Sequence, residues 1–149
     1  MKLSKIGGAG TAALMAAATL LAPQSSAAMQ LGNYDLQTNR YSDASWLWFV
    51  AACIPEKSTD CVQIGGARPR LQRYAYYGGK AFLGGPDNRY TLTVDVPDGL
   101  LCPGQRLPTR ETYSWDATTL VGTIDSVYNV GCFNGPPGHQ FWTFKLQRL

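Results

Sequence analysis

The clearest alternation of apolar and polar residues runs from Arg89 to Val96. Every second residue from Tyr90 to Val96 is apolar, and the positions between are threonines and an aspartate. A period of two is typical of a β-strand with one buried face. Pro97 follows, and a proline cannot donate an N–H to a strand ladder. The pattern therefore predicts a half-buried strand over 89–96 that ends at Pro97.

The segment from Ser45 to Cys53 is apolar at almost every position. Such a run predicts a strand covered on both faces, with Trp46, Trp48 and Val50 on one of them. The chain can return antiparallel over 61–64. Further strand candidates lie at 32–37, 71–77, 80–83, 112–115, 120–127 and 140–146, and turns are predicted at 77–80, 84–88, 116–119 and 134–138.

These patterns predict an all-β protein with a single antiparallel β domain of eight or nine short strands. Beyond residue 28, no stretch keeps apolar residues at helical spacing for three turns, and glycine or proline interrupts nearly every dozen residues. Because consecutive strands can form hairpins, a closed meander barrel of the lipocalin-like kind is favoured over a sandwich. Closure also removes exposed strand edges. The pattern alone leaves the sandwich open.

The first residues have the layout of a signal peptide. Two early lysines precede an uncharged apolar run over 6–22, and small residues follow at 26–28. The run is short for a bilayer span of roughly 20 residues, so cleavage is favoured over a retained anchor. We expect a signal peptide over 1–28 and a single secreted β domain over 29–149. The mature protein would have no membrane span and would be extracellular or at the cell envelope.

The charge balance disfavours nucleic acid as a partner. With the two leader lysines removed from 13 basic residues, 11 basic residues face 10 acidic ones. A nearly neutral domain creates no long-range field that would concentrate a polyanion. The segment 68–77 does mix arginines with tyrosines, but we interpret it as an edge strand with its arginines facing water.

Four cysteines fall in the mature part, namely Cys53, Cys61, Cys102 and Cys132. An even number in a small exported domain predicts two disulfides, and three pairings are possible. A Cys53–Cys61 bridge would close a short polar loop, and Cys102–Cys132 would then form the longer one. The pairwise spacing typical of zinc ligands is missing, so no metal site is expected.

The catalytic inventory is poor. His139 is the only histidine, and no nucleophile motif accompanies it. Paired carboxylates could hydrolyse glycosides, but most of the acidic candidates sit in predicted turns. These candidates are Asp95, Asp98, Glu111, Asp116 and Asp125. No nucleotide, catalytic zinc or calcium motif occurs, so we expect no cofactor and favour a protein that is not an enzyme.

Aromatic side chains gather in three predicted strands. Large rings supply the bulk that a small core needs, so core packing is the favoured interpretation. In a barrel the same rings could line a cavity for an apolar ligand, and on an outer face they could stack on sugars. The candidate ligand-binding residues are Trp46, Trp48, Trp115 and Trp142.

Four motifs stand out along the chain. They are the run 113–123 with Trp115-Asp116-Ala117, the segment from Asp98 to Cys102, Cys132 with Gly135 to Gly138 after it, and the aromatic strand with Trp46 and Trp48 that leads to Cys53 and Cys61. In these motifs the chain resembles a family of small secreted mycobacterial, or more broadly actinobacterial, proteins of unknown function. The resemblance covers most of the mature chain. It implies an envelope or extracellular setting and supplies no catalytic residue.

Three hypotheses about function follow. The favoured one is a secreted, disulfide-stabilised, non-enzymatic β domain with a binding or structural role at the envelope or outside the cell. Its partner would be an envelope glycan, a small apolar ligand or another protein. One alternative is a lipocalin-like carrier of a small apolar molecule, and the other is a secreted hydrolase that uses carboxylates.

Overall fold

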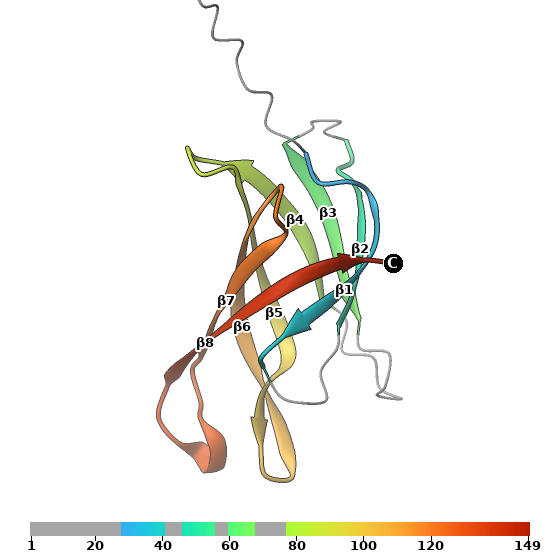
Figure 1. The fold of residues 1–149 in the computed structure, drawn as a ribbon. Helices are drawn as coiled ribbons and strands as arrows, with labels where there is room; N and C mark the ends of the chain where they lie inside the picture. The colour runs from blue at the N-terminus through green and yellow to red at the C-terminus, as the bar shows by residue number, and fades with distance from the viewer. Residues whose placement is uncertain (1–27, 41–45, 56–59, 68–76) are drawn as a thin grey trace, which may run out of the picture.

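The computed structural model describes residues 28–40, 46–55, 60–67 and 77–149, which form one closed barrel of eight strands (Figure 1). A single 3₁₀ turn, η1 (Cys132–Asn134), lies between the last two strands. The strands are β1 (Gly32–Thr38), β2 (Trp46–Ala52), β3 (Cys61–Ala67), β4 (Tyr77–Gly84), β5 (Arg89–Cys102), β6 (Gln105–Asp116), β7 (Val121–Tyr128) and β8 (Gly138–Arg148).

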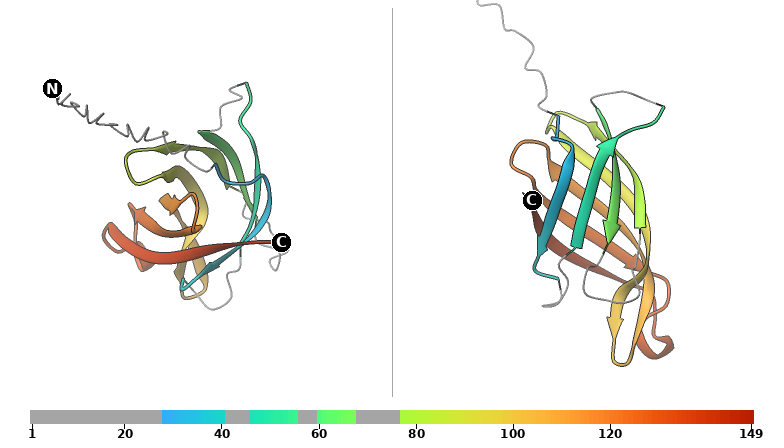
Figure 2. Two further views of the ribbon diagram at one scale, coloured as in Figure 1. Left: turned by 45° about the horizontal axis from the view of Figure 1, so that its top comes forward. Right: turned by 90° about the vertical axis from the view of Figure 1, so that its right-hand side faces the viewer.

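The barrel is an antiparallel meander, as the strand pattern predicted. Each strand pairs with the next one along the chain, and β8 returns to pair with β1, where Leu36 lies opposite Leu146. The two views of Figure 2 show the sheet wrapping around a single interior. Closure leaves no free edge along the body of the sheet, so the open sandwich is not the architecture of this chain.

Aromatic rings fill the interior. The Trp48 ring touches the rings of Trp115, Tyr113 and Phe144 at centroid distances of 5.2, 5.3 and 5.7 Å. Trp48 and Trp115 are fully buried. Tilted ring pairs at these distances each contribute about 0.5–1.5 kcal/mol beyond the area they bury. The core is therefore a stack of aromatic side chains from strands far apart in the sequence.

Two sequence predictions about local structure are wrong. The predicted turn at 77–80 is instead the first half of β4, where Gly78 and Gly79 lie opposite Gly65 and Ile64 of β3. The strand over 46–52 is covered on one face only, because Phe49 is 46% exposed while Trp46, Trp48 and Val50 point inward. In a closed barrel the outer face of a strand meets solvent, so apolar residues on both faces did not mean burial on both.

The predicted end of a strand at Pro97 is also wrong. β5 continues to Cys102, and its pairing with β6 shifts register between Val96 and Leu100. The extra residues form a bulge. A bulge tolerates a proline because its residues are not paired in the ladder, so the missing N–H is not needed there. The bulge bends the strand and carries it into a hairpin that projects beyond the barrel.

Other local predictions are confirmed. The turn after β6 is capped by Asp116, whose Oδ1 accepts hydrogen bonds from the amides of Thr119 and Thr118 at 2.6 and 2.8 Å. These donors hold the pKa of the Asp116 carboxyl below its usual range. The chain also turns between β4 and β5 as expected.

Both disulfides form, and all four cysteines are bonded. Cys53 pairs with Cys61, and Cys102 pairs with Cys132. Two disulfides indicate an oxidising, extracellular compartment. The predicted signal peptide lies outside the described residues except at its last position, and the arginine- and tyrosine-rich stretch 68–76 lies wholly outside them.

Candidate functional site

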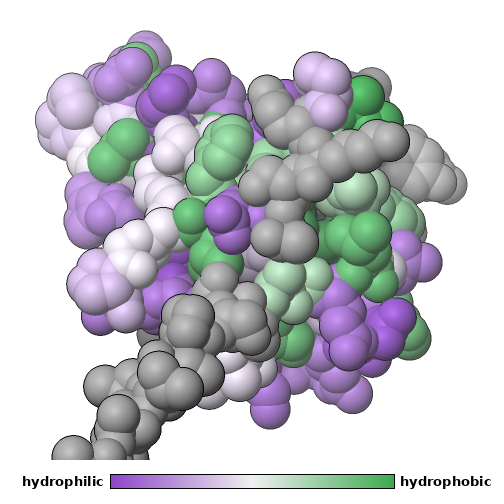
Figure 3. All heavy atoms as spheres, turned by 90° about the horizontal axis from the view of Figure 1, so that it is seen from above, coloured by the Kyte–Doolittle hydropathy of each residue, from purple (hydrophilic) through white to green (hydrophobic). Residues whose placement is uncertain are grey.

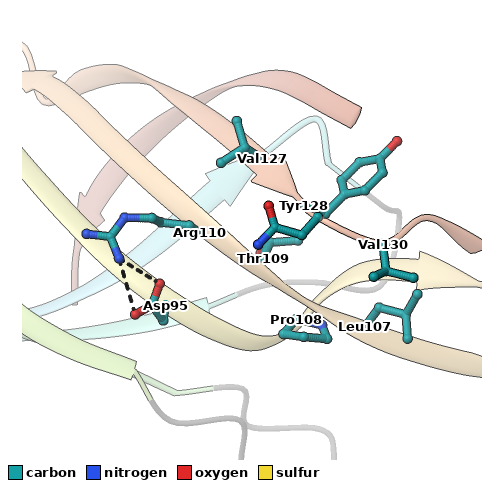
Figure 4. Close-up of a pocket in the computed structure, with 9 residues that line it drawn as sticks. Asp95, Leu107, Pro108, Thr109, Arg110, Val127, Tyr128 and Val130 are labelled. Atoms are coloured by element: carbon teal, nitrogen blue, oxygen red, sulfur yellow. Dashed lines mark hydrogen bonds and ion pairs between the residues drawn. The ribbon is translucent and has the colours of Figure 1, made fainter. Parts of the chain in front are cut away.

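A groove of about 610 Å³ opens at the end of the barrel that carries the Cys102–Cys132 bridge. We call it the tip groove. Figure 4 shows Asp95 and Arg110 at one end of it and Leu107 and Val130 at the other. Its volume lies in the range of pockets that hold small ligands. The nine lining residues are Asp95, Leu107, Pro108, Thr109, Arg110, Val127, Tyr128, Asn129 and Val130.

The groove exists because β6 is longer than its neighbour β7. Pairing between these strands begins only at Arg110 opposite Val127, whereas β6 starts at Gln105. Residues 105–109 therefore extend past the end of β7 as one arm of the β5–β6 hairpin. The chain leaving β7 at Tyr128 forms the other wall, and the Cys102–Cys132 bridge joins the two walls beyond.

An exposed ion pair borders one end of the groove. Arg110 donates to Asp95 from Nη1 at 3.1 Å, and the two side chains are 63% and 77% exposed. Pairs this exposed contribute about 0–1 kcal/mol because water and salt screen them. Asp95 and Arg110 can therefore break their ion pair and bind a polar ligand instead, with little loss of free energy.

Tyr128 forms a wall of the groove by covering a glycine. It lies opposite Gly138 across the β7–β8 ladder, and a Cβ at Gly138 would collide with the Tyr128 ring and hydroxyl. Only a glycine leaves room for the ring to lie flat there. The position of this wall is thus set by Gly138.

A buried ion pair lies directly beneath the groove. Thr109, a groove residue, donates from Oγ1 to Glu111 at 2.8 Å, and Arg40 donates to the same carboxylate at 2.6 and 3.0 Å. The side chains of Arg40 and Glu111 are completely buried. Removing two charges from water costs several kcal/mol, and two direct hydrogen bonds with further donors offset that cost.

Arg40 has two more contacts that fix its position. Its Nη2 donates to the carbonyl of Gly99 in the β5 bulge, and its guanidinium lies 4.3 Å from the centroid of the Trp142 ring. A Cβ at Gly99 would collide with Thr109 and approach Glu111 within 2.7 Å. The bulge therefore brings a bare backbone against the ion pair, which explains why a glycine occupies this position.

Hydrogen bonds connect the ion pair to the aromatic core. The Tyr113 hydroxyl donates to Glu111 at 2.5 Å, Tyr113 and Tyr77 are hydrogen-bonded to each other, and the Trp48 indole donates to the Tyr77 hydroxyl at 2.6 Å. Burial is the largest cause that raises the pKa of both tyrosines, and the Glu111 charge adds to it. A continuous polar chain thus runs from beneath the groove to the barrel centre.

We expect the protein to lose stability at alkaline pH because of these two tyrosines. Their pKa values are raised in the folded state, so above about pH 10 the unfolded chain loses protons that the folded chain keeps. The contribution of these two tyrosines to the free energy of unfolding is therefore constant below that pH, and above it falls by about 1.4 kcal/mol per pH unit for each tyrosine that stays protonated in the folded state.

Denaturant titrations at several pH values, with phenolate absorbance recorded in parallel, measure this loss. In Tyr77→Phe, the free energy of unfolding should fall less steeply with pH above about pH 10, by the contribution of one tyrosine. Phenolate absorbance from all eight tyrosines before any unfolding would contradict the burial of this pair.

The structure places the four tryptophans away from the groove. Trp46, Trp48 and Trp115 are at most 1% exposed and belong to the core, and Trp142 is half-buried against Arg40. None of the four is among the nine residues that line the groove. The packing interpretation therefore accounts for three of them, and Trp142 supports the ion pair.

The candidate catalytic groups are separated. His139 lies in β8, just before the strand expected over 140–146, and its Nε2 is 2.8 Å from Asp125, with both side chains about half exposed. Of the nine groove residues only Asp95 is acidic, and it pairs with Arg110. Glu111 is buried below with Arg40. Within the described residues, no three His, Cys, Asp or Glu side chains group as metal ligands.

Sequence reasoning missed the groove, although one signal marked its hairpin. Pro103 and Gly104 follow the apolar residues Leu100 and Leu101, and a Pro-Gly pair is a strong turn signal. Gly104 takes a φ of +75°, as the second central residue of a type II turn requires. Recognising this turn predicts the β5–β6 hairpin but not the groove, which depends on where β7 ends.

The opposite end of the barrel has a different surface. Viewed from there, hydrophilic residues predominate on the left and at the lower right, and hydrophobic ones gather near the centre and on the right (Figure 3). We assign no site to that end.

Comparison with known proteins adds no assignment: no family, curated protein or solved structure matches the chain. In the described part of the chain, no helix has the length and apolar character needed to cross a membrane.

Proposed function

We propose that this protein is a secreted, non-enzymatic binding domain that acts at the cell envelope or outside the cell, with the tip groove as its binding site. The observation that carries the proposal is the construction of the groove. Its two walls are joined by a disulfide and rest on a closed barrel, yet its lining is open to solvent. A rigid site of this kind loses little conformational entropy when it binds.

The chemistry of the groove supports binding rather than catalysis. Its walls combine apolar groups such as Leu107 and Val130 with one exposed ion pair. Carboxylate-dependent hydrolysis needs two carboxyl groups facing each other across the substrate, at roughly 5–9.5 Å. The lining offers one, and Arg110 already pairs with it.

A carrier of apolar molecules is less well supported, because the aromatic stack occupies the interior where such a ligand would sit. Trp48 and Trp115 make contact across it at 5.2 Å. Admitting a ligand would separate rings whose mutual packing stabilises the barrel.

The export part of the proposal rests on the predicted signal peptide together with the two disulfides. Intact mass measurement of the protein from the culture medium tests it. We expect a chain that begins near residue 29 and a mass lower by four hydrogens than that of the reduced form. A full-length chain in the medium, or free thiols, would contradict export through cleavage.

Binding is tested by sedimentation with a washed cell-envelope preparation from the producing organism. We expect wild-type protein to sediment and Val130→Asp to lower its affinity about tenfold, since a charge placed in the apolar part of the groove must be desolvated. Val130 is 50% exposed, so the substitution leaves the core intact.

Val121→Asp is the matched control. Val121 is 48% exposed and lies on β7 but outside the groove. Its substitution should leave sedimentation within about twofold of the wild type, a difference under 0.5 kcal/mol. Absence of wild-type sedimentation, or an equal loss in both variants, would refute the groove as the binding site.

A further inference from the structure

The outer face of β5–β8 carries three parallel rows of side chains next to the tip groove. The ladders place one residue from each strand side by side in every row. We call these twelve residues the hydroxyl face. The rows are Asp95, Arg110, Val127 and His139; Thr93, Thr112, Asp125 and Phe141; and Thr91, Ser114, Thr123 and Thr143.

Hydroxyl groups make up half of this face. Five threonines and one serine point outward, and each hydroxyl can both donate and accept a hydrogen bond. Thr93 and Thr112 show the spacing, with 3.2 Å between their Oγ1 atoms. Adjacent strands lie about 4.8 Å apart, so neighbouring hydroxyls in the second and third rows are separated by short intervals.

Two exposed charge pairs stand among the hydroxyls. The Asp95–Arg110 pair ends the row nearest the groove, and the Asp125–His139 pair joins that row to the next. Carboxylate oxygens accept hydrogen bonds, while the guanidinium and imidazole donate them. Donors and acceptors thus alternate over the face without a strong net charge.

One large aromatic side chain is exposed within this polar surface. Phe141 is 58% exposed and stands opposite Asp125, between the row that ends at His139 and the row of four hydroxyls that ends at Thr143. The face of an aromatic ring is electronegative and apolar, so it favours contact with weakly positive C–H groups. A ligand that matches the whole face must carry C–H surfaces as well as many hydroxyls.

This composition disfavours the other partner classes. Protein interfaces are depleted in serine, and their energetic centres rarely use threonine, serine or valine. A nucleic acid would meet Asp95 and Asp125, which repel phosphates. An apolar ligand would take these six hydroxyls out of water and offer them no hydrogen bond in return, which is costly.

We propose that the hydroxyl face and the tip groove together bind a saccharide chain, with Phe141 stacking on the C–H face of a sugar ring. The inference rests on the proposed binding function and adds the class of ligand. Arg110 and Val127 belong to both the groove and the first row, so the two surfaces are continuous. The Asp–Arg and Asp–His pairs bind vicinal hydroxyls of the chain.

The envelope sedimentation experiment separates this inference from the proposed function. One sample of the envelope preparation is oxidised with periodate, which cleaves vicinal diols, and another is digested with protease. We expect periodate to abolish sedimentation of the protein and protease to leave it unchanged. If protease treatment of the envelope abolishes sedimentation, or if sedimentation persists after periodate, the saccharide proposal is overturned while the proposed binding function stands. Without wild-type sedimentation to the untreated envelope, the binding function itself fails.

Direct binding to an array of defined neutral oligosaccharides, followed by NMR titration of any that bind, locates the contact. We expect amide shifts in β6–β8 and an affinity about tenfold lower in Phe141→Ala, the change that 1.4 kcal/mol of stacking produces. Thr112→Val removes one hydroxyl with little change of shape and should weaken binding several-fold.

Phe82→Ala is the matched control, because Phe82 is 55% exposed on β4, outside the hydroxyl face. It should bind the oligosaccharide as the wild type does. Failure of every oligosaccharide to bind, or equal losses in Phe141→Ala and Phe82→Ala, would overturn the proposal.

Discussion

Replacing Arg40 by methionine is expected to lower the free energy of unfolding by about 3–5 kcal/mol. Methionine keeps the length and much of the volume of the side chain, but it leaves the Glu111 carboxylate buried without its cation. The variant also loses the hydrogen bond to the Gly99 carbonyl and the contact with the Trp142 ring. The uncompensated charge is the largest of these effects.

Arg110→Met is the control, because it removes the same residue type from an ion pair that water screens. The Arg110–Asp95 pair is 63% and 77% exposed, so its loss should cost under about 1 kcal/mol. Denaturant unfolding followed by tryptophan fluorescence, with both disulfides intact, measures both variants. Similar losses in the two variants would show that burial of the Arg40–Glu111 pair has no energetic consequence.

The double variant Arg40→Met with Glu111→Leu identifies the cause of the loss. Removing both charges avoids the buried unpaired carboxylate, so the double variant should be more stable than Arg40→Met alone. The hydroxyls of Thr109 and Tyr113 still lose their acceptor, which prevents full recovery. A double variant less stable than either single variant would contradict this account.

The architecture could be predicted because it depends on local patterns. Alternation over 89–96 identified a half-buried strand, and the tryptophans at 46 and 48 were correctly placed on one inward face. Turn residues such as Asp116 then divided the chain into consecutive antiparallel strands. A meander of this many strands favours closure because open edges are costly. Of the three disulfide pairings that the sequence left open, the structure has the one in which Cys53 and Cys61 close a short loop.

The buried ion pair could be predicted only in part. Glu111 stands two residues before Tyr113 and four before Trp115, so the alternation of β6 puts its carboxylate on the inward face. An inward carboxylate needs a partner, but nothing local identifies Arg40, which lies 71 residues away. The β5 bulge could not be predicted for a similar reason. The glycine in it is required by its contact with the Arg40–Glu111 pair, and that contact is not local in the sequence.

The candidate site was not predictable because it depends on register between strands. The alternation in 89–96 correctly placed Thr91 and Thr93 on the solvent face. Whether a threonine or an aspartate of the next strand stands beside them is decided by pairing, and a slip of one residue reverses every side chain. The groove similarly depends on the offset between the ends of β6 and β7.

Removing the long disulfide, by Cys102→Ser with Cys132→Ser, is expected to cost about 3.5 kcal/mol of stability. The bridge closes a loop across a separation of 30 residues, which restricts the unfolded chain strongly. Cys53→Ser with Cys61→Ser is the matched control. That bridge spans 8 residues, and the same loop-closure relation gives about 2.5 kcal/mol for it. Denaturant unfolding of both double variants measures the difference.

The two double variants should differ more in binding than in stability. Cys102 and Cys132 join the walls of the tip groove, whereas Cys53 and Cys61 join β2 to β3, away from the groove. Without the long bridge, the β5–β6 hairpin and the chain after Tyr128 can separate. Each binding event must then bring them together again, and the conformational entropy lost in doing so lowers the affinity. Envelope sedimentation measured where both variants are fully folded should therefore weaken only for Cys102→Ser with Cys132→Ser. Equal weakening in both would mean that the disulfides act through the stability of the barrel and not through the groove.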